Sequence, residues 1–164
     1  MQVFIMLSNF KRDLEAAKGA EMLVRETFAS LTFDYTFKDV SDIRDFYYKG
    51  DIRAFNITTG TEVFIEVKHD TCIYKTENVL CEEEVFYKEL GYFGKGNMSC
   101  DCDVYVVVSD ELRKMFVIDF KVLKSIYKKG EFKAIDHPEQ TTYCYLCPIW
   151  LIKKYNGIIS IIDF

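Results

Sequence analysis

Residues 50–68 read GDIRAFNITTGTEVFIEVK, and this stretch decides the fold. It holds two strand-like segments, Gly50–Asn56 and Glu62–Lys68, on either side of Thr58-Thr59-Gly60. A short polar turn with glycine between two such segments predicts an antiparallel hairpin. Side chains alternate along a strand, so Glu66 and Lys68 share one face. The apolar residues of the second arm point the other way; they are Val63, Ile65 and Val67.

Asp51 lies on the first arm of this hairpin and can approach Glu66 across the ladder. Two carboxylates held together favour proton uptake unless a divalent cation sits between them. Oxygen ligands select hard ions, so Mg²⁺ or Mn²⁺ is the natural occupant. Lys68 beside them would stabilise charge developing on a phosphate. The same pattern is also typical of a solvated Glu–Lys face, and the residues alone leave both interpretations open.

The segment before the hairpin predicts a helix over Asn9–Leu31, with Ser8 or Asn9 as its cap. Its apolar residues recur at helical spacing; they are Leu14, Ala17, Val24, Phe28 and Leu31. Glu21 falls within this stripe. A carboxylate on a core face needs a partner, a cation or a raised pKa. At the edge of the stripe it would instead reach water.

The rest of the chain alternates strand and helix patterns. We expect strands over Phe33–Val40, Asn78–Glu84, Val104–Val108, Met115–Ile118, Tyr143–Cys147 and Ile158–Ile162. We expect helices over Phe120–Lys129 and from Pro148 to Tyr155. This order predicts an α/β (mixed α+β) fold in which helices flank a central mixed β-sheet.

Bulk properties narrow the function classes. A length of 164 residues with 49% hydrophobic residues predicts a single domain over 1–164. The net charge of −5 argues against a protein that coats nucleic acid nonspecifically. Met1–Leu7 lacks the features of a signal peptide, and no apolar run is long enough to span a bilayer. We expect a soluble cytoplasmic protein with no membrane partner.

Six cysteines are present: Cys72, Cys81, Cys100, Cys102, Cys144 and Cys147. Without a secretion signal, disulfides are not expected. The pairs Cys100-x-Cys102 and Cys144-x-x-Cys147 leave a zinc or iron–sulfur site open, although small apolar thiols in strands are the commoner use of such spacing.

Several segments together resemble one family. Gly50-Asp51 followed by Phe64-Ile65-Glu66-Val67-Lys68 resembles the D…ExK hairpin of the PD-(D/E)xK nucleases, which include restriction-endonuclease-like and Holliday-junction-resolvase-like enzymes. Residues 68–82, 99–105 and 145–149 resemble later stretches of small phage and bacterial members, in the same order. The resemblance therefore touches nearly the whole chain. Gly50 stands where the family has proline, and Glu77 stands where a glycine is usual.

The resemblance implies a restriction-endonuclease-like core and divalent-metal-dependent hydrolysis of DNA phosphodiester bonds. By it, Asp51 and Glu66 would be ligands of Mg²⁺ or Mn²⁺, and Lys68 the catalytic lysine. Glu21 would be an auxiliary carboxylate and metal ligand on the first core helix. Glu82 matches a glutamate at the end of the next strand. Because cutting two strands needs two sites, a homodimer is a further arrangement that the family implies.

Contacts to DNA have two candidates. Five lysines concentrate positive charge between residues 121 and 133; they are Lys121, Lys124, Lys128, Lys129 and Lys133. Gly91–Gly96 reads as a flexible aromatic loop that could stack on bases. Solvated lysines and an ordinary surface loop are the alternatives. His69 should point away from Lys68, which favours a structural histidine over a catalytic base.

Two other function classes remain at this stage. One is a catalytically inactive nuclease-like module that binds nucleic acid or protein, and absence of metal binding would favour it. The other is a structural protein built around zinc or an iron–sulfur cluster on the cysteines.

Overall fold

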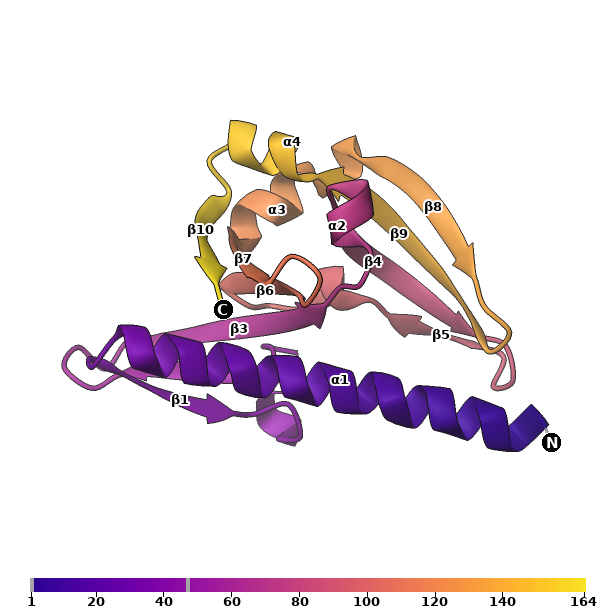
Figure 1. Ribbon diagram of the computed structural model, residues 1–164, viewed down its shortest axis with the longest axis horizontal. Helices are drawn as coiled ribbons and strands as arrows, with labels where there is room; N and C mark the ends of the chain where they lie inside the picture. Colours follow the sequence, from indigo (N-terminus) through magenta and orange to yellow (C-terminus); the bar gives the residue numbers. More distant parts are fainter. Residues whose placement is uncertain (1, 47) are drawn as a thin grey trace.

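The centre of the fold is a six-stranded mixed sheet flanked by helices, in a computed structural model that describes residues 2–46 and 48–164 (Figure 1). Its strands, in spatial order, are β1 (Tyr35–Asp39), β2 (Ile52–Asn56), β3 (Glu62–His69), β6 (Val104–Ser109), β7 (Lys114–Asp119) and β10 (Ile158–Asp163). β3 and β6 run parallel, and the other neighbours are antiparallel. The predicted α/β class with a central mixed sheet is confirmed.

The predicted hairpin is the β2–β3 pair, in which Ile52 lies opposite Ile65 and Ala54 opposite Val63. The alternation of β3 is also confirmed. Val63, Ile65 and Val67 belong to the core on one side of the sheet, while Phe64 belongs to the core on the other side. This alternation directs Glu66 and Lys68 to the face that Phe64 occupies.

Helix α1 (Gln2–Leu31) covers the first of these faces, where Ala20 and Val24 are buried among the strands. The prediction of a start at Asn9 is wrong, because the helix begins at Gln2 and both Ser8 and Asn9 lie within it. Thirty helical residues span roughly 45 Å, more than the strands beneath them. The predicted stripe is therefore buried only in its middle: Leu14 and Leu31, nearer the ends, are exposed.

The opposite face is covered by helices α3 (Phe120–Ile126) and α4 (Ile149–Lys154) and by a second sheet. This antiparallel sheet contains, in spatial order, β5 (Tyr92–Lys95), β4 (Asn78–Tyr87), β9 (Gln140–Pro148) and β8 (Glu131–Asp136). The remaining elements are a short helix and three 3-10 turns: α2 (Ile73–Thr76), η1 (Arg44–Phe46), η2 (Asn97–Ser99) and η3 (Tyr127–Lys129). Figure 1 shows the second sheet on the same side of the central sheet as α3 and α4.

The second sheet was only half predicted. Residues Gly91–Gly96 are not a loop, because β5 pairs with β4 through Phe86–Phe93 and Tyr87–Tyr92. The strand β8 was missed because almost all of its residues are exposed, so it has no alternating pattern to read. The extent of the domain over 1–164 stays a prediction. Within the described residues, no helix is long and apolar enough to cross a membrane.

Gly50 sets the start of β2 and hence the position of Asp51. Its φ of +124° is disfavoured for residues with a side chain, and a Cβ there would lie 2.7 Å from the carbonyl oxygen of Ile65. Proline, the residue that the family pattern has at this position, is locked near −65° and cannot adopt this backbone. The local backbone therefore requires glycine at position 50 and excludes the proline of the family pattern.

Replacing Gly50 with alanine is expected to lower the free energy of unfolding by about 1–3 kcal/mol, from the strained φ and the contact with Ile65. Gly19→Ala is the matched control, because nothing lies within 4 Å of a Cβ at this position in α1. Alanine should stabilise that helix by about 1 kcal/mol. Urea unfolding of both variants measures the difference; equal stability changes would contradict this account of Gly50.

Candidate active site

Asp51 and Glu66 lie together where the β2–β3 ladder ends. The last main-chain bond there runs from the Asp51 N–H to the Ile65 carbonyl at 2.9 Å. The next free donor on β3, the Val67 N–H, is taken by the Asp51 carboxylate at 2.8 Å. The side chain of Asp51 thus continues the ladder by one bond and is held beside Glu66.

The surroundings of these two carboxylates disfavour their charged forms. Burial raises the pKa of Asp51 to about 6, against the opposing hydrogen bond from Val67 and with help from the charge of Glu21. Burial, and then the charge of Asp51, raise the pKa of Glu66 to about 9. Without a cation, Glu66 therefore retains at neutral pH a proton that a free carboxyl group would lose.

Lys68 lies one step further along the same face of β3 and is held by Glu82 of β4. The Lys68 ammonium donates to the Glu82 carboxylate at 2.8 Å, and both side chains are largely buried. Glu82 is itself fixed, because its N–H donates to the Asn97 side chain at 2.9 Å. The sequence pointed to Glu82 without a role; its contact from the second sheet to Lys68 on the central sheet supplies one, as the residue that positions Lys68.

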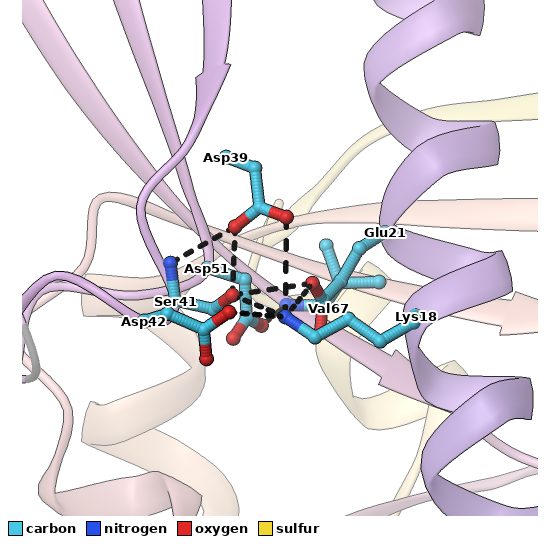
Figure 2. A network of polar contacts seen from close by, with 7 residues as sticks. All are labelled: Lys18, Glu21, Asp39, Ser41, Asp42, Asp51 and Val67. Atoms are coloured by element: carbon cyan, nitrogen blue, oxygen red, sulfur yellow. Dashed lines mark hydrogen bonds and ion pairs between the residues drawn. The ribbon is translucent and has the colours of Figure 1, made fainter.

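Glu21 reaches the same site from α1 and is buried, at 9% exposure. Figure 2 shows the Lys18 ammonium among surrounding oxygens, with Glu21 at 3.0 Å, Asp42 at 3.8 Å and Asp39 at 3.9 Å. The Ser41 hydroxyl accepts a bond from Lys18 and donates to Asp39 at 2.7 Å. Burial raises the pKa of Glu21 while Lys18 opposes this effect. Glu21 thus has both the partner and the raised pKa that a carboxylate on a core face requires.

Two neighbours complete the surroundings. The Cys100 thiol donates toward the Glu66 carboxylate at 3.6 Å, a contact that no spacing in the sequence predicted. His69 pairs with Asp110 in the turn after β6, at 2.9 Å. This contact to a loop side chain agrees with the prediction of a structural histidine.

Several of the lysines between residues 121 and 133 have partners outside the Asp51–Glu66 pair. Lys124 donates to the Cys100 carbonyl at 2.8 Å, Lys128 pairs with Glu83, and Lys133 pairs with Glu131. Among the described residues, those that line the hollows beside Asp51 and Glu66 include none of these lysines. A DNA-binding role for them stays a prediction.

The donors at the site suit Mg²⁺ or Mn²⁺ with few protein ligands. Across residues 2–46 and 48–164, no three His, Cys, Asp or Glu side chains converge as a ready-made metal cage. Mg²⁺ seldom uses such cages, because it keeps several waters and takes one or two carboxylates plus phosphate oxygens. Asp51 and Glu66 supply two buried oxygen donors whose repulsion a divalent cation would relieve. These residues therefore fit the ion.

The cysteines behave as small apolar residues. All six are free thiols, and all but Cys72 are buried. Cys81, Cys144 and Cys147 pack in β4 and β9, in agreement with the strand interpretation. In the described part of the chain they form no metal cluster.

Comparisons with known proteins add little to this geometry. No protein-family model matches the chain, and no curated protein matches it. Among solved structures, the chain is similar to a bacterial homing endonuclease, at a TM-score of 0.46 and 14% sequence identity. The similarity covers 77% of this chain and 74% of the endonuclease chain. A likeness of this degree assigns neither activity nor substrate to the chain.

The raised pKa values predict how the stability of the metal-free protein depends on pH. Between about 4.5, the ordinary value, and about 9, folded Glu66 binds more protons than unfolded Glu66. The free energy of unfolding should therefore fall as pH rises through this window, with Asp51 adding to the fall up to about pH 6. Glu66→Gln should flatten the dependence and stabilise the metal-free protein at pH 8. Urea unfolding with a chelator at pH 5 to 8 measures both effects.

Glu111→Gln is the control, because it removes one exposed carboxylate in the turn between β6 and β7. This variant should follow the wild-type pH dependence. A Glu66→Gln profile as steep as the wild-type profile would show that Glu66 is charged in the folded metal-free protein.

Proposed function

We propose that the protein is a divalent-metal-dependent nuclease of the PD-(D/E)xK kind that hydrolyses DNA phosphodiester bonds. One observation carries the proposal: Asp51, just before β2, lies beside Glu66 on β3, and burial together with the Asp51 charge disfavours the charged form of Glu66, while Lys68 lies on the same face of β3. Burying two repelling carboxylates is costly for a fold. A divalent cation bound between the two carboxylates would relieve their repulsion and would attract an anionic substrate to the site.

In this proposal, Asp51 and Glu66 hold Mg²⁺ or Mn²⁺. When bound, the ion supplies positive charge to the phosphate and promotes the ionisation of water. Water attacks phosphorus, the bond to the leaving oxygen breaks, and a proton ends on that oxygen.

Lys68 stabilises the negative charge that grows on the phosphate during this attack. Glu82 keeps the Lys68 ammonium directed at the site through the 2.8 Å contact between the two side chains. Glu21 acts as the auxiliary carboxylate, held in place by Lys18 and Ser41. Because this carboxylate already bonds Lys18, its share in metal binding would run through its second oxygen or through water. A homodimer stays a prediction from the family pattern.

The test is cleavage of labelled DNA, single-stranded and duplex, by purified protein with Mg²⁺ or Mn²⁺. Lys68→Ala is expected to lower the cleavage rate at least roughly 100-fold, the effect of removing one group that stabilises transition-state charge. Asp51→Asn should lower it as strongly, because it removes a metal ligand. A chelator should abolish cleavage.

Lys114→Ala is the matched control, since it breaks an exposed ion pair with Asp163 on the far strands of the sheet. It should cleave at the wild-type rate. Cleavage that survives both Lys68→Ala and Asp51→Asn would refute the site. DNA binding without cleavage, and without uptake of Mn²⁺ in calorimetry, would instead favour an inactive binding module.

A further inference from the structure

A hollow of about 510 Å³ lies beside Asp51 and Glu66, between the segment before β2 and the β4–β5 pair. Sites for small molecules are commonly roughly 300–1,000 Å³, so it has room for a nucleotide. A second hollow of about 810 Å³ opens toward α1. Asp51, Glu66 and Glu82 line both, so these carboxylates lie where the two hollows adjoin.

Two tyrosines line the smaller hollow. Tyr48 is 59% exposed, and its main-chain carbonyl accepts the Asp101 N–H at 2.6 Å. The Tyr87 ring lies on the backbone of Gly94, where a Cβ would come within 2.7 Å of the ring. It also packs on Tyr92 with ring centroids 5.2 Å apart. The hollow thus presents two aromatic side chains, of which Tyr87 is held in place, and aromatic rings bind nucleobases by stacking.

Lys95 adds a positive charge at the same place. Its ammonium lies 5.4 Å from the centre of the Tyr48 ring. In the described part of the chain it forms no ion pair, although Glu84 lies opposite it on β4. A cation beside an aromatic wall suits the phosphate and the base of one nucleotide.

We infer that this hollow binds one unpaired nucleotide of the substrate strand, next to the bond that is cleaved. The inference rests on the proposed function and narrows its substrate to single-stranded or locally unpaired DNA. In a duplex, the face of a base is covered by its neighbours and cannot meet Tyr48 or Tyr87 without unstacking. A strand bound here would pass the carboxylates and continue into the hollow beside α1.

The polar side chains of the hollow indicate that it accepts any base. Asn97 already uses both ends of its amide, on the Glu82 N–H and the Tyr105 hydroxyl. The Ser99 hydroxyl donates to the Gly96 carbonyl at 2.8 Å. Few groups are left to read a base edge, so stacking dominates, and stacking tolerates all four bases.

The experiment measures binding of fluorescent 12-nucleotide DNA by anisotropy, with Mg²⁺, in a Lys68→Ala background that prevents cleavage. Tyr48→Ala should weaken binding of the single strand about tenfold, the loss of one base stacked on an aromatic ring. Tyr48→Phe keeps the ring and should keep the affinity, which separates stacking from a folding defect. Oligo-dT and oligo-dA should bind within a few-fold of each other. A duplex should bind more weakly and respond little to Tyr48→Ala.

A plot of log affinity against log salt concentration should be less steep for Lys95→Gln, by about 0.7 in slope. This is the change expected when one phosphate contact to a single strand is lost. The controls are Tyr74→Ala and Lys153→Gln, which line a different hollow. Tighter binding of the duplex, or a Tyr48→Ala effect no larger than that of Tyr74→Ala, would overturn the inference. If the wild-type protein binds single strands through Tyr48 but never cleaves them, the proposed hydrolysis is refuted and the proposed nucleotide-binding site is supported.

Discussion

The site depends on one hydrogen bond, from the Val67 N–H to the Asp51 carboxylate. It forms because the main chain of β2 turns away at Gly50, which leaves the next donor of β3 without a main-chain partner. A side chain completes the ladder there, and that side chain is an acid. A hydrogen bond to an ionised acceptor is stronger than one between neutral groups. The same bond brings Asp51 beside Glu66. The hydrogen bond that extends the β2–β3 pairing therefore also places two acidic side chains close together, and the charge of Asp51 raises the pKa of Glu66.

Three layers of the fold then enclose this pair. Helix α1 brings Glu21 with its Lys18 partner, β3 brings Lys68, and the second sheet brings Glu82. Glu21 and Lys68 each meet a partner of opposite sign. Among the described residues, Asp51 and Glu66 form no ion pair, and burial raises the pKa of both.

The second sheet contributes residues to both proposed roles of the site, cleavage of DNA and binding of a single strand. It contributes Glu82, which holds Lys68, and the β4–β5 pair, which walls the hollow with Tyr87 and Lys95. Gly96 permits this approach, because a Cβ there would lie 2.2 Å from the Glu82 carbonyl oxygen. At the start of η2, the main chain therefore lies directly against that of Glu82, the residue that holds Lys68.

Local pattern alone determined the hairpin and the shared face of Glu66 and Lys68, because alternation along a strand depends only on neighbours in the chain. Helical spacing placed Glu21 within the apolar stripe but left open whether it is buried, and it did not give the true start of α1. Only the tertiary structure decided two of the partners: Glu82 for Lys68 and Cys100 for Glu66. It also decided β5 and β8, whose exposed or glycine-flanked residues form strands through pairing with β4 and β9. The contacts of Lys68 with Glu82 and of Cys100 with Glu66 join residues 14 and 34 positions apart, and their geometry exists only once both sheets are packed.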